Sequence, residues 1–316
     1  MVSRNEVISA YRGILGRSPE SEEVIISHLR CDSLEELLSK FLSSPEFTRS
    51  TAGRLNPLEW PAIEVEVDTN GQNLNAMLEH VNATWSHLGA TEPHWSVLTH
   101  PEYKPEVVTQ NKEKFFASGQ RDVKVFQAFL QRNRITFPSE STCFELGCGV
   151  GRVTFALAPL FRKVIAADVS GNHLMIASET NRKNGVENIS FFHVRSLRDI
   201  QSIPSFNVFY SIIVLQHNPP PVISYILRAV LQRLARGGIA FFQIPTYCCS
   251  YNFEVNEYLQ NNRSIEMEMH LLPQEKILDI IYATGCKLVE IREDDFTGMA
   301  QGVSNTFLVR KHGESH

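Results

Sequence analysis

Short runs rich in β-branched and aromatic residues alternate with helical stretches in the second half of this chain. The runs with strand character are residues 142–146, 163–168, 188–194, 206–214 and 238–244. The helical stretches lie near 152–160, 171–184, 219–235 and 273–284. Strands that alternate with helices form a parallel sheet with helices on both faces. We therefore predict an α/β fold with a Rossmann-like, doubly wound, mostly parallel sheet.

The end of the chain departs from this alternation. Residues 286–294 and 304–312 have strand character and are separated only by a loop. Two consecutive strands joined without a helix usually pair antiparallel. We therefore expect an antiparallel strand pair at the C-terminal end of the sheet.

Residues 1–50 predict a small all-α domain. Val7, Tyr11 and Ile14 recur at the spacing of one helical face. Ser18-Pro19 predicts the start of a second helix, and Ser33 with Glu36 predicts a capping box at the start of a third.

The rest of the chain divides further by composition. Pro57, Pro61 and Asn70-Gly71 mark a polar stretch, residues 51–75, that we interpret as a linker. The second domain then spans 76–316. It consists of a helical lead-in, residues 76–138, and a core, residues 139–316.

Composition narrows the possible partners. The net charge of −5 argues against a nucleic-acid partner. Six cysteines without a C-x-x-C pair favour reduced thiols and a cytoplasmic location. The N-terminal residues MVSRNEVISAYRG contain no apolar core of a signal peptide, and no uninterrupted apolar run reaches the roughly 18 residues of a membrane span, so we expect neither. We also predict no metal site, and interpret Asp294-Asp295 as an exposed strand end.

A glycine-rich loop follows the first strand of the core. Gly147, Gly149 and Gly151 are spaced G-x-G-x-G, and Glu145 precedes the first by two residues. Glycines let the backbone approach a ligand, and the helix that follows offers amide donors. A dinucleotide loop would have its third glycine at Arg152, so this spacing argues against NAD. Asp168 ends the second strand, where an acid can accept both hydroxyls of a ribose.

These residues resemble motif I, E/D-x-G-x-G-x-G, of class I S-adenosylmethionine (SAM) dependent methyltransferases. The resemblance implies SAM as cofactor and S-adenosylhomocysteine (SAH) as product. Many family members have Asp after the third strand, where this chain has Arg195-Ser196-Leu197-Arg198. The cofactor contacts that the resemblance implies are Glu145, Gly147, Cys148, Gly149, Gly151, Arg152, Asp168, Val169, Ser196, Leu197, Leu215 and Gln216.

The fourth strand resembles the family's F-D-x-V-x-S-x-x-V-L-x-H segment, with Asn207 in place of Asp. The carboxyl ends of parallel strands face the ligand crevice, so Gln216 and His217 should lie near the methyl donor or the acceptor. His217 is our candidate catalytic base, because an imidazole titrates near neutrality. A histidine that packs under the cofactor or caps the loop is the alternative.

The segment after the fifth strand, up to about residue 272, should lie over the crevice. Its candidate acceptor contacts are Tyr247, Tyr251, Arg263, Glu268 and His270. Upstream, residues 94–99 and 115–119 resemble segments of bacterial sugar or polysaccharide methyltransferases. We interpret Trp95 and Ser118 as lid residues, or Trp95 as core packing and Gly119 as a helix stop.

YRGILGRSPESEEV and LEELLSKFLSSPEF, both within residues 1–50, resemble the bacterial DUF4214 repeat, which often occurs beside glycan-processing enzymes. The module could mediate self-association or bind a partner protein. Our leading hypothesis is O-methylation of a sugar or polysaccharide hydroxyl, of the lipopolysaccharide or O-antigen type. The alternatives are methylation of an amine or carboxylate of a small molecule or protein, and a non-catalytic scaffold.

Overall fold

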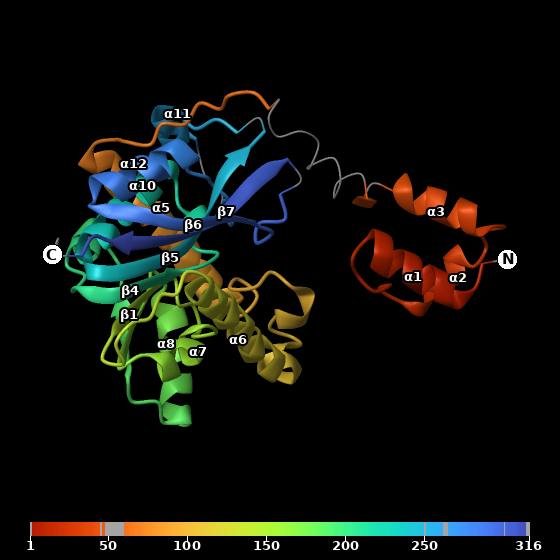
Figure 1. The fold of residues 1–316 in the computed structure, drawn as a ribbon, viewed down its shortest axis with the longest axis horizontal. Helices are drawn as coiled ribbons and strands as arrows, with labels where there is room; N and C mark the ends of the chain where they lie inside the picture. The colour runs from red at the N-terminus through yellow and green to blue at the C-terminus, as the bar shows by residue number, and fades with distance from the viewer. Residues whose placement is uncertain are drawn as a thin grey trace. The chain divides into compact units, whose positions relative to one another are not determined.

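The computed structural model describes residues 2–44, 46–47, 60–249, 251–261, 265–299 and 301–313. They fall into two compact units (Figure 1). One unit comprises Met1–Ala62 with Gly298–Gly302, and the other comprises Ile63–Thr297 with Val303–His316.

The larger unit is built on a seven-stranded sheet with the order β3-β2-β1-β4-β5-β7-β6. Its strands are β1 (Thr142–Leu146), β2 (Lys163–Asp168), β3 (Ile189–His193), β4 (Phe206–Ser211), β5 (Leu234–Cys248), β6 (Cys286–Asp294) and β7 (Gly302–Lys311). Strands β1 to β5 pair parallel, and β6 pairs antiparallel with β7. The predicted Rossmann-like sheet with one antiparallel pair is confirmed.

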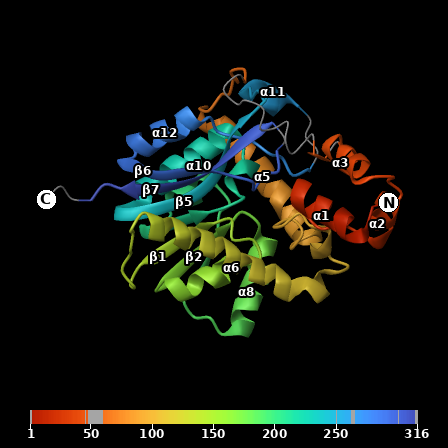
Figure 2. The same ribbon diagram turned by 45° about the vertical axis from the view of Figure 1, so that its right-hand side comes forward.

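Helices cover both faces of this sheet (Figure 2). They are α5 (Gly71–Thr91), α6 (Val108–Arg132), α7 (Thr154–Leu157), α8 (Gly171–Asn184), α9 (Leu197–Gln201), α10 (Pro220–Arg233), α11 (Val255–Gln260) and α12 (Gln274–Ala283). Neighbouring strand residues point to opposite faces: Phe209 packs in the cluster of α10 and α12, whereas Tyr210 packs with α6. Burying each such ring contributes about 1.5–3 kcal/mol.

The fourth strand is shorter than predicted. It ends at Ser211 instead of residue 214, because Ile213 adopts a left-handed φ of 60° and Leu215–His217 forms a 3-10 turn. A left-handed backbone cannot continue a strand. The chain therefore turns at the carboxyl end of β4, where the candidate site lies.

Helix α5 begins within the stretch predicted as linker. The Asn70 side chain accepts from the Asn73 N–H and caps the helix, so the turn expected at Asn70-Gly71 is a helix start. Residues 51–59 of that stretch lie outside the described residues.

The N-terminal unit contains α1 (Arg4–Ile14), α2 (Glu22–His28) and α3 (Leu34–Leu42), which pack around Tyr11, Leu37 and Phe41. Ser33 caps α3 as predicted, but Glu36 accepts from the N–H of Asp32 and not from that of the cap residue. The predicted helix start at Ser18-Pro19 is wrong. Ser21 caps α2, because its side chain accepts from the Val24 N–H.

None of the helices in the described part of the chain has the length and apolarity that crossing a membrane requires. All six cysteines are free thiols.

Candidate functional site

The glycine loop has the backbone that its spacing predicts. Gly147, Gly149 and Gly151 have φ values of 76°, 52° and 90°, which side chains rarely tolerate. A Cβ atom at Gly147 would lie 2.2 Å from a methyl of Val214, and one at Gly149 would lie 2.6 Å from a methyl of Val97. Glycine is therefore required here both for conformation and for close packing.

Asp168 ties this loop to the end of β2. Its two carboxylate oxygens accept from the N–H groups of Gly149 and Ser170, each at 2.8 Å. The loop also donates from Gly147 N to the Ala167 carbonyl at 2.7 Å. Each carboxylate oxygen keeps a second lone pair, so Asp168 can brace the loop and still accept from a ligand hydroxyl.

Glu145 is a buried acid with unused hydrogen-bonding capacity. Burial raises the pKa of its carboxyl to about 7, although the nearby Arg152 opposes the shift. Its Oε2 atom has no hydrogen-bond partner within the described residues. A buried oxygen of this kind can accept from a cationic ligand.

Arg152 is held from behind the loop. It forms an ion pair with Asp122 at 2.7 Å, and it donates to Ser118 at 3.2 Å. The approach of α6 depends on Gly119, because a Cβ atom there would lie 2.0 Å from the Arg152 carbonyl oxygen. The interpretation of Gly119 as a helix stop is wrong, since α6 continues through it.

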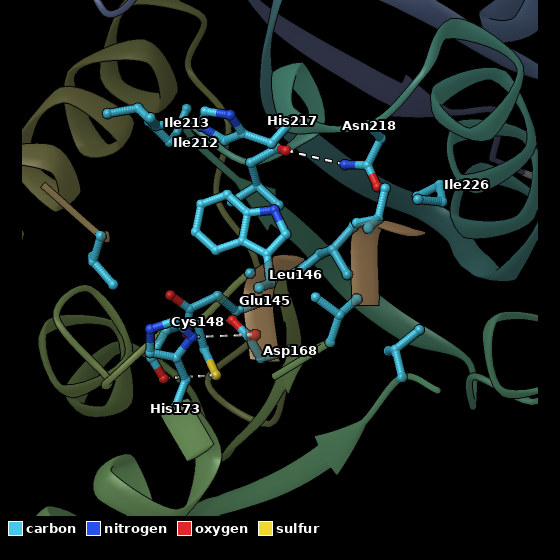
Figure 3. A pocket seen from close by; sticks show the side chains of 18 of the residues that line it. Glu145, Leu146, Cys148, Asp168, His173, Ile212, Ile213, His217, Asn218 and Ile226 are labelled. Carbon is cyan, nitrogen blue, oxygen red and sulfur yellow. Dashed lines mark hydrogen bonds and ion pairs between the residues drawn. The ribbon is translucent and has the colours of Figure 1, made fainter. Parts of the chain in front are cut away.

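A cavity of about 1050 Å³, including space open to solvent, lies at the carboxyl ends of β1, β2 and β4. Glu145, Cys148, Asp168 and His173 gather on one side of it, and His217 and Asn218 lie on the other (Figure 3). Of the predicted cofactor contacts, seven line it: Glu145, Gly147, Cys148, Gly149, Arg152, Asp168 and Val169.

Other predicted contacts lie outside the lining. Ser196 caps α9, where its hydroxyl accepts from the Asp199 N–H. Leu197 packs against the neighbouring core, and Leu215 is itself buried in it. Gln216 is buried beside His217, and Gly151 turns the loop into α7.

The helix α5 contributes residues that sequence reasoning missed. Leu78, Val81 and Trp85 line the cavity from one face of this helix. The Trp85 ring lies 5.0 Å from that of His217. Their spacing is that of any buried helix face, so no sequence signal marked them. By contrast, Trp95 and Ser118, predicted as lid residues, are not among the lining residues.

His173 was also missed. Its Nε2 lies 3.0 Å from the Ser96 hydroxyl, and its Nδ1 lies 3.9 Å from Asp168 Oδ1. Burial lowers the pKa of this imidazole, although the Asp168 carboxylate opposes the shift. This ring lines the cavity beside the acid at the end of β2.

His217 lies at the other end of the cavity. Its Nδ1 is 2.8 Å from the main-chain carbonyl of Glu268, and its Nε2 is 3.4 Å from Gln216 Nε2. A carbonyl only accepts, so Nδ1 carries the hydrogen and Nε2 keeps a lone pair. Burial lowers the pKa of His217 to about 4. The ring is therefore neutral at neutral pH.

The segment predicted to cover the crevice forms a polar cluster. Glu268 accepts from the Tyr258 hydroxyl at 2.7 Å and lies 3.0 Å from His270 and 3.2 Å from His80 of α5. Tyr251 lies 2.8 Å from the other ring nitrogen of His270. Although burial opposes it, hydrogen bonds from His270 and Tyr258 lower the pKa of Glu268 to about 2.

The weaker acceptor candidates have different positions. His270 and Tyr251 belong to this cluster, and Tyr247 is half-buried near the end of β5; none of the three is among the residues that line the cavity. Arg263 lies outside the described residues. Within the described ranges, no group of three or more His, Cys, Asp or Glu side chains is arranged to hold a metal ion.

Comparison with known proteins agrees with this geometry. Residues 144–238 match the model of a family described as a methyltransferase domain. This stretch includes the glycine loop, Asp168 and His217. The chain therefore contains a SAM-dependent methyltransferase domain, and SAM is its cofactor.

The matches to individual proteins are partial. Over 70 residues the chain is 33% identical to a tRNA/tmRNA (uracil-C(5))-methyltransferase from a Nitratiruptor species. The match covers 22% of this chain and only 19% of that protein.

Solved structures resemble the chain at the level of the fold. The [4+2]-cyclase SpnF is 13% identical with a TM-score of 0.47, and the match covers 80% of this chain and 100% of that chain. Magnesium protoporphyrin IX methyltransferase from Synechocystis PCC 6803, with bound SAH, is 16% identical with a TM-score of 0.45. That match covers 63% of this chain and 86% of the other. Similarities this weak say nothing of the reaction or of the acceptor.

Proposed function

We propose that the whole chain is an O-methyltransferase that uses SAM to methylate a sugar or polysaccharide hydroxyl, of the lipopolysaccharide or O-antigen type. One observation carries the proposal: a neutral imidazole, His217, lines the same cavity as the glycine loop and Asp168. A hydroxyl acceptor needs a group that takes its proton, and an uncharged histidine can do so.

The residues on the cofactor side fit SAM. Asp168 would accept from the ribose hydroxyls, and the buried, unpartnered Oε2 of Glu145 would accept from the ammonium of the amino-acid end. The cradle of Gly147 and Gly149 leaves no room for side chains. When bound, SAM supplies the methyl group as a reactive sulfonium.

His217 would take the acceptor proton at Nε2. The contact that Gln216 makes with this nitrogen is long, at 3.4 Å, so an acceptor hydroxyl can replace it. A pKa of about 4 does not disqualify the base. The acceptor oxygen becomes strongly acidic as it bonds to the methyl carbon, so a weak base suffices at that stage. Trp85 packs against the ring and helps to exclude water.

The choice of a sugar rests on two kinds of support. Glu268, His270 and Tyr258 form a hydrogen-bonded cluster next to the Glu268 carbonyl that contacts His217, and their carboxylate, imidazole and hydroxyl are groups of a kind that binds sugar hydroxyls. Residues 94–99 and 115–119 resemble segments of bacterial sugar methyltransferases, and residues 1–50 resemble a module found beside glycan-processing enzymes. These resemblances concern sequence and not the chemistry of the site, so the acceptor must be tested directly.

The test is transfer of labelled methyl from SAM to a panel of methyl hexosides, free amino sugars and bacterial polysaccharides. We expect label in hydroxyls, and a loss of kcat of about 100- to 10,000-fold in His217→Gln. SAH affinity should be the same in the variant and the wild type. Transfer to amines that survives His217→Gln would contradict a hydroxyl acceptor. Cofactor binding without transfer to any member of the panel would favour the scaffold alternative.

A further inference from the structure

The proposed base is connected to the centre of the sheet by a chain of amides. Gln243 of β5 is fully buried and sits behind the turn that follows β4. Its side chain bonds to Ile213 N at 3.0 Å, to Gln216 Oε1 at 3.0 Å and to the Ser304 hydroxyl at 2.7 Å. Gln216 in turn contacts His217.

The direction of each hydrogen bond in this chain follows from its two ends. The main-chain N–H of Ile213 can only donate, so the oxygen of Gln243 faces it and the nitrogen faces Gln216. Gln216 therefore accepts with its oxygen and presents its NH₂ group to His217 Nε2. From the opposite side, the Glu268 carbonyl requires a hydrogen on Nδ1. The Gln216 donor at Nε2 and the Glu268 carbonyl at Nδ1 both require the tautomer of His217 that carries its hydrogen on Nδ1.

The same glutamine also supports a strained backbone. Ile213 has a φ of 60°, a left-handed conformation that a β-branched residue rarely adopts. Ile213 lines the cavity, and its N–H is held by Gln243 Oε1. Such strain persists only where surrounding contacts enforce it.

We infer that Gln243 is a positioning residue: by orienting Gln216 and holding the Ile213 turn, it keeps the Gln216 NH₂ group against His217 Nε2 and so keeps that nitrogen unprotonated until an acceptor hydroxyl replaces the amide. The inference rests on the proposed role of His217. An N–H donor at a ring nitrogen favours the neutral imidazole. Without Gln243, the Gln216 amide can rotate and present its oxygen, which favours the protonated ring.

The titratable groups that face His217 come from the segment between β5 and about residue 272. His270 and Glu268 lie there, and the charge of His270 adds to burial in lowering the pKa of His217. His80 of α5 reaches Glu268 rather than His217. These groups remain in place when Gln243 is changed, so a change in the titration of His217 reports on the amide chain.

The test is a pH titration of the His217 ring by ¹⁵N NMR in the full chain, with the signal assigned by its loss in His217→Gln. We expect Gln243→Met to raise the proton affinity of the ring at least about tenfold. Ser304→Ala is the matched control, because it removes a partner of the same amide outside the path to His217. It should leave the titration unchanged.

A Gln243→Met protein that titrates like the wild type would overturn the inference. If Gln243→Met does not fold, Gln216→Met removes the same donor from His217 and should raise the proton affinity in the same direction; an unchanged titration there would equally overturn it. The measurement needs neither acceptor nor methyl transfer. An unchanged titration would therefore leave the proposed function standing. Absence of methyl transfer, in turn, would not change the result of the titration.

Discussion

The two sides of the cavity are built in different ways. On the cofactor side, consecutive residues of two loops create the site, and the main chain does most of the work: Gly149 and Ser170 donate backbone N–H groups to Asp168. On the side proposed for the acceptor, groups from distant segments meet. The Trp85 ring comes from α5, the His217 ring follows β4, and the main-chain carbonyl of Glu268 comes from the segment after β5.

This difference indicates what each side tolerates. A site made of backbone geometry fails when a Cβ atom is added or a bracing carboxylate is lost. A site made of side chains can change one contact and keep the others. We therefore expect the cofactor side to be the more sensitive to single substitutions, and the following predictions test that expectation.

The largest effect should come from Asp168→Ala. The change removes the acceptor for two main-chain N–H groups and for the ribose hydroxyls, and hydrogen bonds to a charged group contribute about 1.5–3 kcal/mol each. We expect SAH affinity to fall more than about 100-fold in calorimetric titration. Asp279→Ala, an exposed acid on α12, is the control and should bind normally. Affinity within about threefold of the wild type would remove Asp168 from the cofactor site.

A second test compares two left-handed glycines. Gly147 has a φ of 76°, and the Val214 side chain occupies the space that an added Cβ would take. Gly185 has a φ of 64° and nothing within 4 Å of an added Cβ. Both alanine variants should lose about 1–2 kcal/mol of unfolding free energy in urea, since both force a side chain into the left-handed region, and Gly147→Ala should lose about 1–3 kcal/mol more because its Cβ overpacks against Val214.

Only Gly147→Ala should also weaken SAH binding. Gly147 and Val214 both line the cavity, so relieving their clash moves the loop that holds the cofactor, and we expect the affinity to drop by roughly ten- to a hundredfold. If Gly185→Ala weakened binding as much, the loss would reflect general stability and the contrast between the two sides would not hold.

The contrast also explains which parts could be predicted from the sequence. The sheet, its antiparallel pair and the glycine loop were predictable, because period, spacing and φ preference act within a few residues. Asp168 was predictable for the same reason, since it ends a β-rich run. The turn at Ile213 was not, because a β-branched residue gives no local signal for a left-handed backbone, and the Gln243 side chain that accepts from its N–H comes from another strand.

The missed site residues share one cause. Trp85 looks like any apolar residue on an amphipathic helix, and His173 follows the N-cap of α8 without a motif of its own. Gly119 was interpreted as a helix stop, because nothing local shows that the Arg152 carbonyl lies 2.0 Å from where its Cβ would be. Contacts between segments far apart in the chain decide these positions.

A third prediction uses the pKa of Glu145, which burial raises to about 7. An ammonium group binds the ionised carboxylate better than the protonated form, so SAH affinity should rise with pH through this value. We expect about a tenfold increase from pH 6 to pH 8. 5′-Methylthioadenosine lacks the amino-acid end and should show no such increase, and neither should SAH with Glu145→Gln. A flat profile for SAH with the wild type would show that Glu145 only braces the loop.

The smallest effect on cofactor binding should come from Glu268→Gln on the acceptor side, where SAH affinity should stay within about twofold. Stability should change instead. The pKa of Glu268 in the folded protein, about 2, lies below that of an unfolded chain, near 4.5. The carboxylate therefore stabilises the fold above about pH 4.5, and this contribution is lost as the pH falls towards 2.

Glu268→Gln should thus be less stable than the wild type by about 1–3 kcal/mol at pH 7, and the difference should shrink below about pH 4.5 and close towards pH 2. Urea unfolding at several pH values measures it, with the exposed Glu257→Gln on α11 as control. A variant that lost SAH affinity while keeping its stability would place Glu268 on the cofactor side. The two sides would then not be separable, because one cluster would serve both the acceptor and the cofactor.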